Sequence, residues 1–253
     1  NYSSGATPGN SNPNQVIQNT PSSEPTEYNK DYITARKYTC EACKKAFQEK
    51  GYRWHPWFNL IGVRNKEAGN KVHNIYDDTM VLCYQDGDGT GAKVGNEETK
   101  NWSITTEPGD RHMDKSANKA HMLNKLGTVI MMPGQYKYRK GKHGGYTAFR
   151  QYSGIWAQRD NNMDGYYDYD TAKKYWVAGD DRKCENGSKG CSPNGVNIHR
   201  SAGAGTTKRI NGYSAGCQVF ANGGDLSQLI SIYDKINSIP KDATDDMKTF
   251  TYT

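Results

Sequence analysis

The sequence predicts a mainly β protein with a helix near each end of its folded part. Tyr (18) and Gly (27) are abundant among the 253 residues, a composition that suits sheets with one solvated face better than a helical bundle. Short apolar runs, separated by clusters of Gly, Asp and Asn, fill the middle of the chain. Two segments with helical spacing flank these runs. We therefore expect an α+β chain dominated by an irregular β-sheet core.

The expected elements follow from these patterns. The first helix is predicted over residues 29–50, with Gly51 as its C-terminal cap. The second is predicted over residues 226–239, where Asp225 would cap the N-terminus and Pro240 would stop the helix. The predicted strands are residues 58–63, 80–84, 128–132, 146–156 and 196–199.

The composition changes sharply near residue 30. Residues 1–29 are Ser, Asn, Pro, Gly and Thr with almost no apolar spacing, which indicates a flexible linker or arm. Residues 30–253 are predicted to form a single catalytic domain. Because the chain starts at Asn1 without Met, we expect that this domain followed another module or a processed leader, as part of a larger chain or assembly.

The charge balance is mildly basic. Lys+Arg number 33 and Asp+Glu number 27, which gives a net charge of +6 and a pI near 8.8. No dense basic run is interleaved with aromatic residues, so nucleic acid is not the predicted partner. An anionic bacterial envelope would attract such a surface, although ordinary solubilising charge explains it equally well. No stretch approaches the ~20 apolar residues of a membrane span.

The six cysteines leave their pairing open. Cys40 and Cys43 have metal or redox spacing, but they lie in a predicted helix without a matching second pair, which argues against zinc. Cys184 and Cys191 bracket a polar loop that a disulfide could close. Cys217 would remain free if the others pair.

The chemistry of the chain is predicted to lie between residues 198 and 220. A strand ends at His199, and a turn of small residues, Ser214-Ala215-Gly216, leads directly into Cys217. A nearby imidazole can deprotonate a thiol, so we expect Cys217 as the nucleophile and His199 as its base. Gly216 would let a substrate backbone approach and leave amide groups free as oxyanion donors, and Ser214 would orient the imidazole or the substrate. The alternative is a core histidine beside a small buried cysteine.

This stretch resembles the catalytic motif of the L,D-transpeptidase (YkuD-type) family. The family has a histidine after a strand and Ser/Thr-x-Gly-Cys about eighteen residues later, and here 217 − 199 = 18. The run 129–136, with Pro133 and Gly134, resembles the family's strand and Pro-x-Gly turn more loosely, so the resemblance spans about residues 129–220. It implies an L,D-transpeptidase-like β-sandwich or irregular sheet, and a divergent member of the family.

Three departures from the family pattern concern the site. The family usually has Gly where this chain has Arg200, often has His where it has Ala215, and has Arg where it has Val219. If that arginine holds an anionic substrate group, Arg200 or Arg209 must take its place. Tyr213 and His143 complete the predicted substrate-binding set, and His143 is expected in an exposed loop beside the cleft.

The resemblance implies a function in the bacterial cell wall. We expect acyl transfer on peptidoglycan stem peptides at the carbonyl of the third-position diamino acid, by hydrolysis or cross-linking, with no required cofactor. A cell-wall remodelling enzyme, a phage lysin and a toxin all fit, and each implies a cell-envelope, extracellular or virion-associated location. The alternative is a non-enzymatic, calcium-stabilised β-rich module of a surface or virion assembly.

A second motif predicts a structural calcium ion. Asp160, Asn162, Asp164 and Asp168 match positions one, three, five and nine of a calcium loop, with Gly165 at the sharp turn. Thr171 stands at position twelve instead of a bidentate Glu. The alternative is an acidic turn between two strands.

Overall fold

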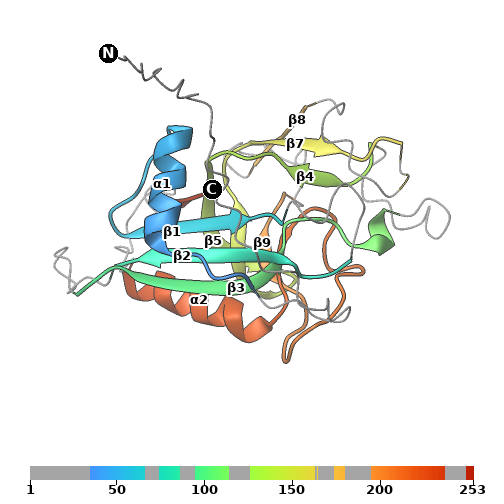
Figure 1. The fold of residues 1–253 in the computed structure, drawn as a ribbon. Helices are drawn as coiled ribbons and strands as arrows, with labels where there is room; N and C mark the ends of the chain where they lie inside the picture. Colours follow the sequence, from blue (N-terminus) through green and yellow to red (C-terminus); the bar gives the residue numbers. More distant parts are fainter. Residues whose placement is uncertain are drawn as a thin grey trace, which may run out of the picture.

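The computed structural model describes residues 35–65, 74–85, 95–113, 126–162, 164, 174–179, 195–236 and 249–253. Strands dominate these residues, and two α-helices accompany them (Figure 1). The predicted class, mainly β with helices, is therefore confirmed. The predicted arm at residues 1–29, the Cys184–Cys191 pair and Asp168 lie outside the described residues.

Eight strands close into a barrel, an arrangement that the sequence did not predict. Around the barrel the order is β1-β11-β5-β6-β9-β10-β3-β2. The β1–β11 and β9–β10 pairs are parallel, and the other neighbours are antiparallel. The bounds are β1 (Phe58–Val63), β2 (Asp78–Tyr84), β3 (Glu98–Thr105), β5 (Tyr136–His143), β6 (Tyr146–Gln151), β9 (Ile198–Arg200), β10 (Gln218–Phe220) and β11 (Thr249–Tyr252).

A second, three-stranded sheet stands beside the barrel in the order β4-β7-β8, with β4 (Val129–Met131), β7 (Ile155–Arg159) and β8 (Tyr175–Val177). The prediction of one strand over residues 146–156 was wrong, because the chain leaves the barrel at the end of β6. There the N–H groups of Tyr152 and Ser153 both donate to the carbonyl of Lys137, at 2.8 and 3.2 Å. This turn feeds β7 into the second sheet.

The barrel interior holds the main core. Alternate residues of the strands meet there, as the period-2 geometry of a strand requires. Aromatic rings fill much of the space: Phe149 and Phe250 lie 4.9 Å apart, and both pack against Tyr233 of the second helix. The buried members from the strands include Leu60, Met80, Leu82, Tyr138, Ile198, Phe220 and Tyr252.

Helix α1 (Cys40–Lys50) covers the outer face of β1 and β2. Thr39 caps it by accepting a hydrogen bond from Ala42 N at 3.2 Å, and Gly51 (φ 67°) ends it as predicted. The predicted start at residue 29 was wrong for the described part, since residues 35–39 are not helical. Cys40 is joined to Cys83 of β2 by a disulfide, whereas Cys43 is a buried free thiol.

Helix α2 (Gly223–Ile236) packs its apolar stripe on the barrel core, through Leu226, Leu229 and Tyr233. Its predicted start was three residues late. Asn222 precedes the helix and accepts a hydrogen bond from Gly224 N at 2.8 Å, so Asp225 lies inside the first turn. In Figure 1, α1 and α2 lie on opposite sides of β1 to β3. No helix among the described residues is long and apolar enough to cross a membrane.

Candidate active site

The candidate site lies on the outer face of the barrel, where β9 runs parallel to β10. Gln218 pairs with Ile198, and Val219 pairs with His199. Because Ile198 and Phe220 point into the core, the alternating side chains His199 and Cys217 belong to the opposite face. Strand β6 is the other neighbour of β9, so the β5–β6 hairpin borders the site.

The turn before Cys217 is held from two sides. Inside the turn, Ser214 Oγ donates to the carbonyl of Cys217 at 2.9 Å and accepts from Gly216 N at 3.1 Å. From outside, Val129 N of β4 donates to Ala215 O at 3.3 Å. Ser214 therefore shapes the turn, and neither of these two hydrogen bonds of its hydroxyl involves His199.

Gly216 is required by the packing of this turn against β4. Its φ is +127°, and a Cβ built on it would lie 2.3 Å from the carbonyl oxygen of Val129. The N–H of Gly216 is engaged by Ser214, so it is not the free oxyanion donor that the sequence predicted. Among the described residues, the N–H of Cys217 has no hydrogen-bond acceptor, which leaves this amide available to a ligand.

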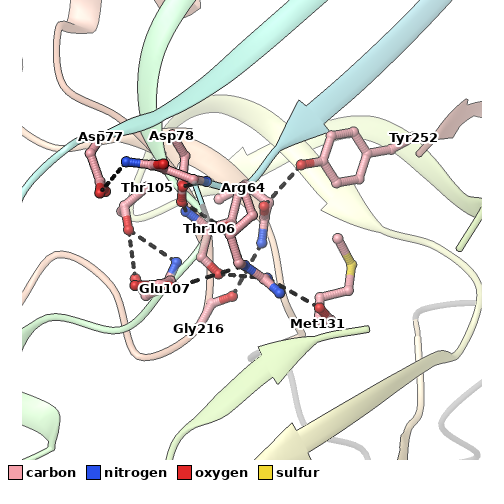
Figure 2. Close-up of polar contacts among 11 residues, drawn as sticks. Arg64, Asp77, Asp78, Thr105, Thr106, Glu107, Met131, Gly216 and Tyr252 are labelled. Atoms are coloured by element: carbon pink, nitrogen blue, oxygen red, sulfur yellow. Dashed lines mark hydrogen bonds and ion pairs between the residues drawn. The ribbon is translucent and has the colours of Figure 1, made fainter. Parts of the chain in front are cut away.

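A buried chain of hydrogen bonds supports the turn from the barrel interior (Figure 2). Tyr252 of β11 donates its hydroxyl proton to Gln218 Oε1 at 2.9 Å. Gln218 Nε2 in turn donates to Gly216 O at 3.4 Å. Both side chains are almost completely buried, so the C-terminal strand helps to fix the backbone beside the cysteine.

A second buried cluster in Figure 2 joins the barrel to the three-stranded sheet. Asp78 accepts hydrogen bonds of 2.7 Å from Asn65 N, Thr106 N and Thr106 Oγ1. Burial raises the pKa of this carboxyl, while the guanidinium of Arg64 and these donors oppose the rise. Arg64 also donates to Met131 O of β4 at 3.1 Å. The cluster thus fixes β4, the strand on which the Cys217 turn rests.

Cys217 is a half-buried residue whose sulfur has two polar neighbours. Asn197 N donates to Sγ at 3.4 Å, and Sγ lies 3.8 Å from Gly195 O. Burial raises the pKa of the thiol to about 11, although the Asn197 N–H and the charge of Arg150 oppose this rise. At neutral pH the resting cysteine is therefore a thiol.

The imidazole of His199 is buried and its tautomer is defined by its neighbours. Its Nδ1 lies 2.9 Å from the carbonyl oxygen of Arg200, which can only accept, so Nδ1 carries the proton. Tyr146 OH lies 3.2 Å from the same nitrogen and donates to Arg200 O at 3.3 Å. Nε2 therefore keeps a lone pair, as a general base requires.

The pKa shifts of Cys217 and His199 favour the uncharged form of both groups at neutral pH. Burial, and then the nearby His143, lower the pKa of His199 to about 4, while the bond to Arg200 O raises it slightly. No hydrogen bond joins the ring to Cys217 Sγ in the described structure. Proton transfer from the thiol to the ring would therefore need the sulfur and the ring to come closer together, as catalytic groups often do only when a ligand binds.

His143 lies beside His199, at the end of strand β5, and not in the exposed loop that the sequence predicted. Its ring stacks on His199 with centroids 4.2 Å apart and planes 17° apart. Asn197 Nδ2 approaches His143 Nδ1 at 3.4 Å. The site is thus a cluster of Cys217, His199 and His143 from three strands or their ends.

The other predicted substrate-binding residues lie differently. Arg200 follows His199 on β9, but its guanidinium covers the Tyr146 ring at 4.3 Å and donates to Gly203 O at 2.8 Å. Arg209 and Tyr213 are exposed. Of the two predicted arginines, Arg200 therefore lies next to His199 and contacts Tyr146.

Three residues of the site were missed by the sequence analysis. Tyr146, Asn197 and Arg150 contact or influence the two histidines or the cysteine. Asn197 and Tyr146 could have been suspected, because each lies in or beside a predicted strand and Asn197 is two residues from His199, on the same face. Arg150 could not, because only the pairing of β6 with β9 brings it near.

The predicted calcium loop is described in part. Asp160 is buried, while Asn162 and Asp164 are exposed and contact each other, with Nδ2 to Oδ2 at 2.8 Å. In the parts of the chain that the structure describes, no group of three His, Cys, Asp or Glu side chains could hold a metal ion. Calcium binding by this loop stays a prediction.

Comparisons with protein-family models, with curated proteins and with solved structures find no match for this chain. The resemblance to the L,D-transpeptidase motif therefore rests on the sequence alone, over about residues 129–220.

Proposed function

We propose that this protein is a cysteine acyltransferase or peptidase that acts on the stem peptides of bacterial peptidoglycan. One observation carries the proposal. His199 and Cys217 belong to the same outer face of the parallel strands β9 and β10, and the hydrogen bond from His199 Nδ1 to Arg200 O leaves Nε2 unprotonated. A thiol and a correctly protonated imidazole on one face are the components of nucleophilic acyl transfer.

The proposed reaction begins from the neutral pair. As Cys217 Sγ attacks the amide carbonyl, His199 Nε2 takes the thiol proton, and the N–H of Cys217 donates to the developing oxyanion. The imidazolium then protonates the departing amine as the C–N bond breaks, which leaves a thioester. Water or an acceptor amine attacks this thioester and gives its proton to Nε2 as the C–S bond breaks. The imidazolium then returns this proton to the thiolate, which restores the neutral pair.

The substrate class comes from the motif resemblance. It implies stem peptides cut or joined at the carbonyl of the third-position diamino acid. Because Val219 stands where the family has arginine, we favour hydrolysis over cross-link synthesis. The Cys40–Cys83 disulfide supports a cell-envelope, extracellular or virion-associated site of action, since disulfides persist in oxidising compartments. A remodelling enzyme, a phage lysin and a toxin are all compatible with this chemistry.

Intact-protein mass spectrometry with a carbapenem tests the nucleophile. We expect one covalent adduct on the wild type and none on Cys217→Ala. Cys43→Ala is the matched control, because Cys43 is the other free cysteine of the described residues and its thiol is buried; it should be labelled like the wild type. Labelling that persists in Cys217→Ala would exclude the assignment.

Digestion of purified sacculi tests the substrate. Trimmed stems in the released muropeptides would indicate hydrolysis, and new 3-3 cross-links would indicate transpeptidation. Unchanged muropeptides, with an active wild type in the acylation assay, would exclude peptidoglycan while leaving the acyl-transfer chemistry in place.

A non-enzymatic module is the second candidate, and one observation favours it. Burial raises the pKa of the Cys217 thiol to about 11, whereas a reactive cysteine is expected to have a lowered pKa. Titration with a thiol reagent under native conditions separates the two. A rate near that of Cys43 would favour the module, and a rate that depends on His199 would favour the enzyme.

A further inference from the structure

The amide of Asn197 has a defined orientation. Gln151 N on β6 donates to Asn197 Oδ1 at 3.2 Å, so the oxygen of the amide is on that side and Nδ2 is on the other. Nδ2, which can only donate, lies 3.4 Å from Nδ1 of His143. Nδ1 of His143 must therefore accept, and the neutral ring carries its proton on Nε2. This tautomer is the opposite of the one that Arg200 O imposes on His199.

The stacking of the two rings disfavours the protonation of both at once. They are stacked 4.2 Å apart, so two imidazolium charges would face each other directly. The charged or titratable groups around them are Arg150 and Tyr146 from β6, Arg200 from β9 and Cys217 from the turn before β10. In the described part of the chain no carboxylate contacts either ring, so nothing offsets a second positive charge.

His143 is also connected to the sulfur. Its Nδ1 accepts from the side chain of Asn197, and the backbone N–H of the same Asn197 donates to Cys217 Sγ at 3.4 Å. Asn197 is almost fully buried. A displacement of His143 would therefore remove one of the contacts that fix the donor beside the nucleophile.

We propose that His143 is a positioning residue of this site: it covers the imidazole of His199 so that the ring stays neutral and aligned, and it anchors Asn197 beside Cys217. This inference rests on the proposed acyl-transfer function. Direct contact of His143 with the substrate is not required. The lowered pKa of His199 agrees with the stack, since after burial the nearby His143 is its next cause, whereas burial and then the charge of Arg150 lower the pKa of His143.

Nitrogen-15 NMR of the histidine rings in the full chain tests the tautomers without any substrate. At neutral pH we expect His143 Nδ1 to resonate as an unprotonated nitrogen and His199 Nδ1 as a protonated one. The two signals are assigned by their loss in His143→Phe and His199→Gln. A protonated Nδ1 on His143 would overturn the proposal. The tautomers themselves are read from the wild type, and the two variants serve only to assign the signals.

The pKa of His199 in two variants tests whether His143 covers its ring and keeps it neutral. His143→Phe keeps a stacked ring but removes the group that can take up a proton, and His143→Ala also admits water. We expect the pKa of His199 to rise in the order wild type, His143→Phe, His143→Ala, by about one pH unit in the last. His55→Ala is the control, since His55 lies before β1 and should leave this pKa unchanged. An unchanged pKa in His143→Ala would refute the inference.

The acylation assay separates this inference from the proposed function. We expect the acid limb of the wild-type acylation rate to lie near the pKa of His199 and to move upwards in His143→Ala. If the wild type is never acylated but its tautomers and pKa values are as expected, the proposed function fails and the arrangement of the imidazole pair stands.

Discussion

Gly216 and Val129 approach more closely than any residue with a side chain would allow. A Cβ on Gly216 would lie 2.3 Å from the carbonyl oxygen of Val129 and 2.9 Å from its Cγ2. The φ of Gly216, +127°, is also one that L-residues rarely adopt. The site therefore requires glycine at position 216 mainly because the turn packs against β4. The access that glycine gives to a substrate is a secondary reason.

The first prediction is that Gly216→Ala destabilises the fold and abolishes acylation. Overlap with β4 and the unfavourable φ should together lower the free energy of unfolding by about 2–5 kcal/mol. Gly205→Ala is the matched control, because Gly205 also has a positive φ (73°) but has nothing within 4 Å of a built Cβ. It should cost about 1 kcal/mol, measured by urea unfolding. Equal losses in the two variants would contradict the packing argument.

The second prediction concerns stability and pH. The pKa of His199 is about 4 in the fold against 6.5 for the free side chain, so the unfolded chain binds the proton more tightly. Stability from this group is present above pH 6.5 and is lost as pH falls from 6.5 to 4. The loss corresponds to about 3 kcal/mol.

Urea unfolding of the wild type and of His199→Gln between pH 4 and pH 7 measures this effect. The variant should be less sensitive to acid than the wild type by about 3 kcal/mol over that range, although other groups contribute equally to both. It should also lose acylation by ~10²–10⁴-fold, since that is the usual size of general-base assistance. If His199→Gln unfolds with no rate effect in the folded fraction, His199 is structural.

Features that depend on short-range patterns were predicted better than the architecture. The strand 58–63 was predicted with its observed bounds, and His199 and Cys217 were predicted for one site, because both depend on short-range patterns. The closure of the barrel was not, because it depends on parallel pairing of β1 with β11, across most of the chain. Strand β3 was also missed, because four of its residues, 98–101, are polar and lack the alternation of a half-buried strand.

The roles of individual residues were harder to predict than their identity. Ser214 was expected to orient the imidazole or the substrate, whereas in the structure its hydroxyl closes the turn. The Cys40–Cys83 disulfide forms because α1 packs on β2, which brings together residues 43 positions apart. Nothing in the local sequence indicates this pairing. Local spacing therefore predicts a candidate nucleophile and a candidate base, whereas the hydrogen bonds that set the tautomer of His199 depend on the tertiary fold.

The third prediction concerns Arg150. Its positive charge favours the thiolate of Cys217, so Arg150→Gln should raise the pKa of the thiol and slow its acylation about 2- to 5-fold, with a smaller difference at high salt. Arg139→Gln is the control, since Arg139 pairs with Arg150 across the hairpin but lies over the ring of Tyr152. The pH dependence of thiol alkylation above pH 8 measures the change. A larger effect in the Arg139 variant would reject the assignment.

The last prediction concerns the support of the turn from the C-terminal strand. Tyr252→Phe removes the donor to Gln218 Oε1 and leaves that buried oxygen unsatisfied, which should cost about 1–3 kcal/mol. Because Gln218 also holds Gly216 O, acylation should fall as well, in protein that is still folded. Tyr136→Phe is the control: its hydroxyl donates to Met132 O at 3.1 Å, away from the turn. It should lower stability to a similar extent and leave the acylation rate of the folded protein unchanged. Equal acylation rates for the two variants, measured well below their melting temperatures, would mean that the hydrogen bonds behind Gly216 stabilise the barrel without positioning Cys217.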